Sequence, residues 1–293
     1  MATPASSLVS ESTAPPGAGG ERSAPTIYRK PPEICRPADR AATGAESFTT
    51  EAIERSVVRL GLRLRDAVPD DLDRLLRLQD AWFRPPPARR INAYELHRLV
   101  GFGRVALLET AAGEIVGFDL AADYAGEPGT AGSAGLAVDP AYTGRGLGTL
   151  LMRHSMLRSM AAGAAARRGI VHPENLPSLV TLLNHLGAVC DGFFRRFGDW
   201  GQPRLTHCCH LRPEVLREDR VDRGRLTRFL RIGRRGEDYR LLLPRDEDAL
   251  DLLYRQGRFL VAAVVPPACG VPEAALLALP RERLTREAPG RGS

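Results

Sequence analysis

The chain has 293 residues, 43% of them hydrophobic and 26% charged, so it can bury a sizeable core and has the composition of a globular protein. Its formal net charge of +6 comes from 41 basic and 35 acidic residues, and Lys30 is its one lysine. A Walker-type phosphate loop and a Schiff-base enzyme each need a lysine in the folded site, so the sequence argues against both. The longest apolar run, at 259–268, is too short to span a bilayer, and the N-terminus lacks a secretory signal, so we expect a cytoplasmic protein without membrane contact.

Five cysteines, odd in number and irregularly spaced, do not suggest a disulfide framework and suit a reducing compartment. The run THCCH at 206–210 contains four side chains of the kind that bind metals. In a strand, however, His207 and Cys209 point to one face while Cys208 and His210 point to the other. The four cannot then converge on one ion, and we predict no metal site.

The predicted elements begin after a long N-terminal tail. Residues 1–55 are rich in Ala, Pro, Ser, Gly and Thr without hydrophobic periodicity, which predicts disorder. Alternating apolar and basic residues predict a strand at 59–67, and apolar residues at helical spacing predict helices at 69–83 and 92–100. Two apolar runs joined by the turn AAGE predict a β-hairpin at 103–124.

Strands and helices then alternate. A strand at 134–139 leads through a glycine-rich loop into a long helix at 145–166. A strand at 169–174 leads into an amphipathic helix that ends at Gly187, and two more strands follow, at 188–198 and 203–211. The predicted fold class is α/β (α+β), with a mixed, mostly antiparallel sheet flanked by helices.

The character of the chain changes after Arg212. Charged residues alternate densely up to Arg240, and a strand, a helix and a strand are predicted between 238 and 265, with 279–293 as a fraying tail. We expect a folded domain at 56–212 and a small C-terminal α/β extension of unknown role at 213–293. Its arginines could bind nucleic acid, but acidic residues are interleaved among them, which favours a solvated, self-paired surface. The extension is expected to shape a substrate cleft or an oligomer contact, such as that of a homodimer.

The loop DPAYTGRGLGTLL at 139–151 carries the strongest functional signal. Glycines at a helix start let a backbone approach a ligand closely, the free N–H groups there attract an anion, and Arg145 adds a positive charge. The dinucleotide fingerprint does not fit, because five residues separate Asp139 from Arg145 and the glycines are spaced as G-x-G-x-G. The combination favours a pyrophosphate-binding loop over a connection without a ligand.

This order of elements, with the loop VDPAYTGRGLGTLL and the later segment HPENLPSLVTLLNHLGA, resembles the GNAT superfamily of acyl-CoA-dependent N-acyltransferases over about residues 59–212. The resemblance implies a GNAT-like fold and an enzyme that moves an acetyl or other short acyl group from acetyl-CoA, as co-substrate, to the amine of a small molecule or a protein. It implies that coenzyme A is bound by the pyrophosphate loop, by the preceding strand and by the start of the later helix: Thr143, Gly144, Arg145, Gly146, Gly148, Leu136, Val138, Asn175 and Ser178.

Two positions depart from the family pattern. Thr143 stands where Gln or Arg is usual, and Leu183, or Leu182 in another alignment, stands where many relatives have a Tyr that protonates the leaving thiolate. Water or His185 could replace that acid. The candidates for the base are Asp119, Asp123 and His172. The alternative function is a non-catalytic acyl-CoA-binding or regulatory module with the same fold.

Overall fold

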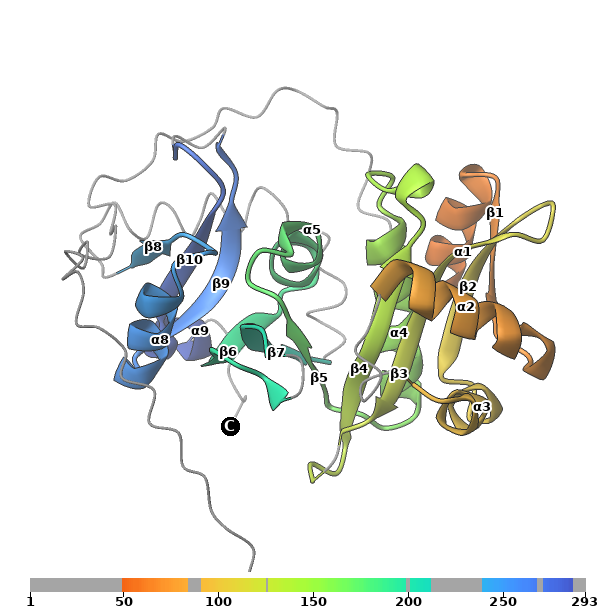
Figure 1. The fold of residues 1–293 in the computed structure, drawn as a ribbon, viewed down its shortest axis with the longest axis horizontal. Helices are drawn as coiled ribbons and strands as arrows, with labels where there is room; N and C mark the ends of the chain where they lie inside the picture. Colours follow the sequence, from red (N-terminus) through yellow and green to blue (C-terminus); the bar gives the residue numbers. More distant parts are fainter. Residues whose placement is uncertain are drawn as a thin grey trace, which may run out of the picture.

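The computed structural model of the chain describes residues 49–83, 91–124, 126–198, 201–211, 239–267 and 271–286. In these ranges ten strands form one mixed sheet with helices against it (Figure 1). The strand order is β1-β2-β3-β4-β5-β7-β6-β9-β10-β8, and β4 and β5 are the one parallel pair among these neighbours. The predicted fold class, with its mostly antiparallel sheet, is confirmed.

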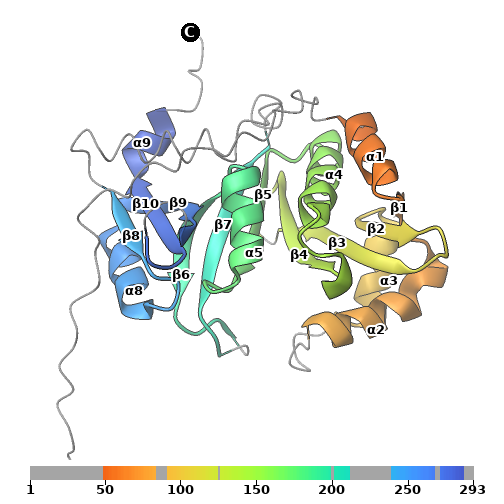
Figure 2. The ribbon, with the colours of Figure 1, turned by 90° about the horizontal axis from the view of Figure 1, so that it is seen from above.

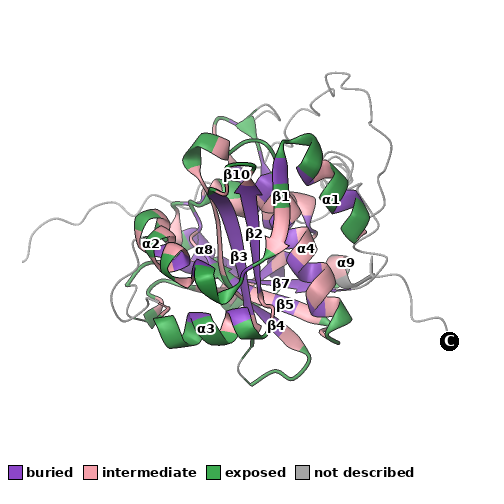
Figure 3. Cartoon of the chain, turned by 90° about the vertical axis from the view of Figure 1, so that its right-hand side faces the viewer, coloured by how far each residue is buried: buried purple, intermediate pink, exposed green. Residues whose placement is uncertain are grey.

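The first four strands form a meander between two layers of helices: β1 (Leu62–Asp66), β2 (Val105–Thr110), β3 (Ile115–Asp123) and β4 (Thr130–Val138). One face packs against η1 (Pro69–Asp71), α2 (Leu72–Phe83) and α3 (Ala93–Gly101), and the other against α1 (Thr50–Arg59) and α4 (Leu147–Ala161). Residues of β2 and β3 alternate between these layers and are almost all buried, while the helices expose their outer sides (Figure 3). The predicted helices and the hairpin are confirmed.

Helix α1 begins inside the segment for which the sequence predicted a disordered tail. The Thr49 side chain caps it by accepting a hydrogen bond from the Ala52 N–H at 3.2 Å, and Ile53 and Val57 are buried against the sheet. The predicted boundary at residue 55 is therefore wrong. It was missed because this short amphipathic segment directly follows a long stretch rich in Ala, Pro, Ser and Gly, whose composition predicts disorder. The rest of the predicted tail, at 1–48, lies outside the described residues.

Strands β4 and β5 (Ala166–Val171) pair only at their beginnings, from Thr130 opposite Ala166 to Gly132 opposite Arg168. Beyond these pairs they diverge, as the view from above shows (Figure 2). Helix α4 follows β4 and α5 (Leu176–Leu179) follows β5. Because the two strands are parallel, both helices begin at the same end of the strands, next to the point where β4 and β5 diverge.

Two predicted helices differ in extent. Helix α4 ends at Ala161 rather than near 166, because Gly163 at φ 87° ends it and residues from 166 on join β5. The helix predicted as far as Gly187 is only one α-turn, α5, followed by a π-helical turn, η4 (Val180–His185). The wider turn coincides with a contact to a distant strand, in which the Asn184 amide donates to the Val264 carbonyl and accepts from the Val264 N–H.

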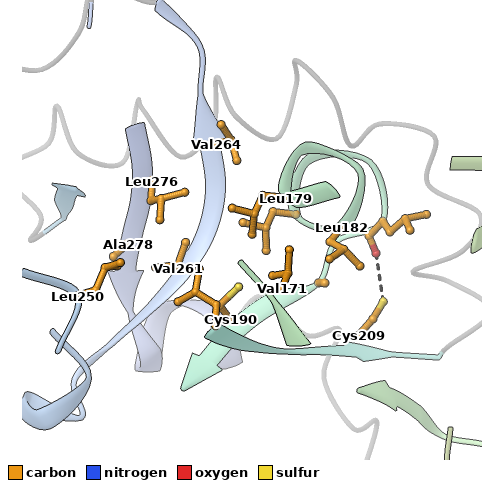
Figure 4. Packing of buried hydrophobic residues seen from close by; sticks show 14 of the residues in the cluster. Val171, Leu179, Leu182, Cys190, Cys209, Leu250, Val261, Val264, Leu276 and Ala278 are labelled. Atoms are coloured by element: carbon orange, nitrogen blue, oxygen red, sulfur yellow. Dashed lines mark hydrogen bonds between the residues drawn. The ribbon is translucent and has the colours of Figure 1, made fainter. Parts of the chain in front are cut away.

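The C-terminal extension continues the same sheet. After β6 (Val189–Phe194) and β7 (Arg204–His210) come β8 (Arg240–Leu242), α8 (Glu247–Gln256), β9 (Phe259–Val265), β10 (Ala275–Pro280) and α9 (Arg281–Arg286). Strand β9 pairs with β6, and one hydrophobic cluster joins side chains before and after the connector, including Leu179 and Val171 with Val261, Val264 and Leu276 (Figure 4). The predicted fraying tail at 279–293 is wrong as far as residue 286, and the charged connector at 212–238 lies outside the described residues.

Candidate active site

The glycine loop is an exposed, sharply bent connection between β4 and α4. Gly144 and Gly146 have φ of 75° and 79°, which side chains rarely adopt, and a Cβ on either would meet no other atom within 4 Å. The Asp139 carboxylate accepts from the Ala141 N–H at 2.8 Å, and the Thr143 hydroxyl donates to the Pro140 carbonyl at 2.9 Å. The glycines therefore expose the backbone, while Asp139 and Thr143 fix the shape of the loop.

The first turn of α4 favours an anion. Gly146 is the N-cap and brings no side chain to bond the first N–H groups, and the first turn contains no acidic residue. The Arg145 guanidinium lies over the Tyr142 ring at 5.1 Å, beside these groups. Backbone N–H groups, the helix dipole and an arginine thus combine at one end of α4.

The fold brings the end of β4 against this turn. A Cβ on Gly148 would lie 3.9 Å from Leu136 Cδ2 and from Val138 Cγ2, and both side chains are half-buried. This part of β4 no longer pairs with β5. The predicted strand residues and the loop therefore form one continuous surface along the divergence.

Asn175 and Ser178 lie at the start of α5, at the same edge of the sheet. Asn175 is exposed, and its side chain accepts from the Ser178 N–H at 3.3 Å as the helix cap. Both residues lie at the end of the strands where the glycine loop also lies, and their contact with coenzyme A stays a prediction.

Asp119 is fully buried and already paired. Its two carboxylate oxygens accept from Arg167 Nη2 at 3.0 and 2.8 Å, and Arg167 also donates to Ser155 of α4. A base must reach a substrate with a free oxygen. Asp119 does not meet this requirement, and the arrangement is that of a structural ion pair that joins β3, β5 and α4.

Asp123 is exposed at the far end of β3. Its carboxylate pairs with Arg104 at 2.8 Å, and its side chain is 85% exposed. It lines a small cavity of about 210 Å³ with Ser159 and Gly163, at the C-terminal end of α4, whereas the glycine loop is at the other end of that helix. A helix of this length spans roughly 20 Å, so Asp123 and the glycine loop lie at opposite ends of α4. The role of Asp123 as a base stays a prediction.

His172 lies directly after β5, at the open edge of the divergence. Its Nδ1 accepts from the Glu174 N–H at 3.2 Å, so the neutral ring carries its proton on Nε2. Burial and the nearby Arg204 lower its pKa below the usual value, which keeps the ring neutral at pH 7. In this state His172 is a hydrogen-bond donor at Nε2 rather than the predicted base.

Leu183 is fully buried in the cluster between α5 and the extension, and Leu182 is buried beside it. Neither position faces a cleft, so neither replaces the tyrosine of the family pattern. His185 ends η4 and is half-buried, and its part in catalysis stays a prediction.

Sequence reasoning missed a carboxylate in a second, larger cavity, of about 490 Å³. Asp191 lines it, where a bulge between Cys190 and Gly192 interrupts the pairing of β6 with β7. The run CDG within a strand was the available signal, because a glycine inside a strand often marks a bulge.

The buried His207 and Cys209 do not form a metal site. Among the residues that the structure describes, no three His, Cys, Asp or Glu side chains are grouped to hold an ion. Burial and Arg167 lower the pKa of His207 to about 4, and the Cys209 thiol contacts the Leu186 carbonyl. Nor is any helix within the described ranges long and apolar enough to cross a membrane.

One protein family matches part of this chain by sequence. Residues 60–182 match the sequence model of the acetyltransferase (GNAT) family. Similar solved structures include the ribosomal-protein-S18-alanine N-acetyltransferase of Escherichia coli (17% identity, 51% of this chain and 94% of that one, TM-score 0.43). Others are the putative acetyltransferase yncA of Salmonella typhimurium with acetyl-CoA (17%, 52% and 94%, 0.44) and a GCN5-related N-acetyltransferase of Kribbella flavida (29%, 45% and 34%, 0.37). No curated protein sequence matches the chain.

The matched residues run from the start of β1 through the glycine loop to the middle of η4, and they contain the whole divergence of β4 and β5. The TM-scores are below 0.5, so the assignment rests on the sequence match, together with the predicted loop motif. Residues 60–182 therefore form a domain of the acetyltransferase (GNAT) family.

Proposed function

We propose that this chain is an N-acyltransferase that moves an acetyl or other short acyl group from coenzyme A to an amine. The observation that carries the proposal is the continuous surface formed by the uncapped start of α4, the open glycines and the diverging end of β4. A dianionic pyrophosphate fits the loop, and an extended chain fits beside a strand edge with free backbone groups.

Each residue predicted to bind the acyl donor, acetyl-CoA, has a distinct role. The backbone from Thr143 to Gly148 binds the pyrophosphate, and Arg145 adds a charge to it. Leu136 and Val138 lie along the pantetheine, with their backbone N–H groups toward the thioester. Asn175 and Ser178 border the same edge.

Acyl transfer forms a C–N bond and breaks a C–S bond, while the amine loses a proton and the thiolate gains one. Holding the amine and thioester together supplies several kcal/mol of the barrier, so weak acid and base groups suffice. The neutral His172 ring offers Nε2–H as a hydrogen-bond donor that stabilises the leaving thiolate, and the thiolate then takes its proton from water. His185 is the second candidate for this hydrogen-bond donor. Water accepts the proton of the amine, because Asp119 is buried in its pair with Arg167 and Asp123 is paired with Arg104.

The test is acetyl-CoA binding by Gly146→Asp, measured by calorimetry. A negative side chain at this position should weaken binding at least tenfold, because it repels the pyrophosphate. Gly163→Asp is the matched control: Gly163 also has a positive φ, of 87°, with no atom within 4 Å of its Cβ, but it lies beyond the opposite end of α4. Both substitutions strain the backbone alike, so only the position relative to the loop differs.

Equal affinity of the two variants for acetyl-CoA would show that the glycine loop does not bind it. If acetyl-CoA binds but no amine in a broad panel releases free thiol, the transferase function is wrong and a binding module remains.

A further inference from the structure

A β-bulge in β4 marks the place where this strand leaves β5. The register of β3 with β4 shifts so that Ala134, between Ser133 and Gly135, has no partner on β3, and Ala134 is exposed. The last pair of β4 with β5 is made by Gly132, two residues before the bulge. Bulges redirect side chains and are frequent beside active sites. Strand β4 therefore changes course where the sheet opens.

Gly135 follows the bulge and faces α2, on the side of the sheet opposite α4 (Figure 2). Its backbone is not in the left-handed region, and a Cβ there would make ordinary contacts, at 3.4 Å from Leu120 Cδ1 and 3.5 Å from the Phe83 ring. By contrast, a Cβ on Gly169 of β5 would lie only 2.9 Å from Ser133 Cβ. The fold thus requires glycine at 169 but not at 135, where the missing side chain leaves room beside the Phe83 ring.

The wall beside Gly135 is aromatic. Phe83 packs edge-on against Phe118 with ring centres 5.8 Å apart, and Trp82 stacks on the same Phe118 ring at 5.6 Å. Phe118 is buried, whereas Phe83 is 36% exposed. The packed neighbours hold Phe83 in position while part of its ring stays uncovered.

Ile170 of β5 borders the opening from the other strand. It is two residues beyond the last pair with β4, as Gly135 is on β4 once the bulge is counted. The next residue, Val171, packs with side chains of α4 and α5, and successive strand residues alternate, so Ile170 points to the α2 side. Strand β5 lies inside the sheet, between β4 and β7, yet Ile170 is 37% exposed. Two uncovered apolar side chains, Phe83 and Ile170, therefore border the opening on this face.

The reacting end of the proposed donor reaches this opening. The pantetheine arm has about as many chain atoms as four residues of backbone, so beside β4 it extends roughly 13 Å. From the glycine loop after Val138, that length leads back to Ala134 and Gly135. The donor occupies the α4 side, along Leu136 and Val138, which leaves the α2 side for the amine.

We propose that Gly135, with Phe83 and Ile170, selects the acceptor, and that the acceptor is an amine with a bulky, uncharged, apolar group next to its amine-bearing carbon. The side chains of Ala134, Phe83 and Ile170 carry no charge and no hydrogen-bonding atom, so apolar surface is what they bury on a ligand. The inference rests on the proposed acyl transfer and its donor placement, and it adds the class of the substrate.

The experiment replaces Gly135 by valine and compares 2-phenylethylamine with ethylamine. With acetyl-CoA saturating, Gly135→Val should raise KM for 2-phenylethylamine about tenfold and KM for ethylamine less than about twofold, because the added side chain fills the space that the phenyl group needs. The Kd of acetyl-CoA should not change, and thermal unfolding checks the fold. Gly101→Val is the matched control, because Gly101, at the end of α3, also lies outside the left-handed region with no atom within 4 Å of its Cβ position. Ile170→Ala should weaken 2-phenylethylamine too, whereas Leu252→Ala, an exposed position on α8, should not.

Binding without turnover separates the two proposals. With free CoA present, saturation-transfer NMR should detect 2-phenylethylamine on the parent and lose it in Gly135→Val. Equal binding and equal KM in the two proteins, or no binding of the amine to the parent, overturn the selection by Gly135 even if other amines are acetylated. A defect of Gly135→Val that follows the acyl group, with hexanoyl-CoA against acetyl-CoA, and not the size of the amine would assign the space to the donor and overturn it too. Selective binding without acetylation of any amine keeps the selection and contradicts the proposed transfer.

Discussion

Asp119 and Asp123 lie four residues apart on β3 and on the same face, yet their surroundings differ completely. Asp119 is buried with Arg167, whereas Asp123 is exposed beside Arg104. The spacing placed both carboxylates correctly on one face. It could not show that β5, distant in sequence, supplies a guanidinium to only one of them.

Asp119→Ala should therefore destabilise the protein strongly. It leaves the Arg167 guanidinium buried and uncompensated, which typically costs about 3–5 kcal/mol. Urea unfolding measures the loss, and Asp123→Ala, which removes an exposed partner, should change the free energy of unfolding by less than about 1 kcal/mol. Similar losses in the two variants would contradict the structural role of the buried pair.

His172→Ala tests the proposed hydrogen-bond donor to the leaving thiolate. Removing a donor aimed at a developing anion should lower the single-turnover acetylation rate at least tenfold, since one such donor contributes roughly 10²–10³. The Kd of acetyl-CoA should stay within twofold. His97→Ala, on the exposed side of α3, is the control. An unchanged rate in His172→Ala would shift the role to His185 or to water.

At the scale of elements, an ion-pair network joins β1, β2 and η1. Arg65 donates to Glu109 of β2 and to both carboxylate oxygens of Asp71, and Arg63 also binds Glu109. Hydrogen bonds from Arg65, and then from Arg63, hold the pKa of Glu109 at about 2, against 4.5 for a free side chain. The network keeps β1 at the sheet edge.

A lowered pKa makes this network sensitive to acid. Its contribution is complete above about pH 4.5 and is lost as the pH falls toward 2, because Glu109 must then take up a proton. We expect Glu109→Gln to be less stable than the parent by on the order of 2 kcal/mol at pH 7, and this difference should shrink as the pH falls from 4.5 toward 2, because Glu109 of the parent then becomes protonated. Chemical unfolding across this range measures it. The exposed Glu114→Gln, in the same hairpin, should follow the parent at every pH.

The contact of η4 with β9 is a second link between elements. Asn184 bonds both the N–H and the carbonyl of Val264, at 2.8 and 2.9 Å, so Asn184→Ala leaves two backbone groups of β9 without these bonds. We expect a loss of roughly 1–3 kcal/mol and faster hydrogen exchange at the Val264 amide. Thr181→Ala, elsewhere on the same helical segment, serves as the control. Unchanged exchange in Asn184→Ala would mean that packing alone holds the extension.

At the scale of the whole molecule, the extension and the GNAT domain share one sheet and one hydrophobic cluster. Strand β9 covers the edge of β6, and side chains such as Val261 and Val264 pack with Leu179 of α5. Among the described residues, the extension thus continues the sheet of the domain.

Truncation after Arg212 should therefore impair the domain itself. Removing β9 exposes the edge of β6 and part of the shared cluster, and such an edge promotes aggregation. We expect 1–212 to be aggregated, or to melt well below the full chain, as measured by light scattering and thermal unfolding. A monomeric, equally stable 1–212 that binds acetyl-CoA normally would show that the extension is dispensable for the fold.

The sequence by itself determined the local structure and the kind of site. Hydrophobic periodicity identified the strands and helices of the domain, and the glycines of the loop, with Arg145, indicated an anion site at the start of α4, because these features depend on neighbours in the chain. The family motif, confirmed by the match at 60–182, then indicated acyl transfer.

Only the tertiary structure decided which polar groups are available for chemistry. Whether Asp119 is paired, whether Leu183 faces a cleft, and whether Asp191 points into a cavity depend on strands that are distant in sequence: β5, β9 and β7. The π-turn at η4 and the order of α1 likewise follow from contacts made after the chain has folded. Periodicity records the face on which a residue lies, whereas its partners are set by which strands become neighbours in the sheet.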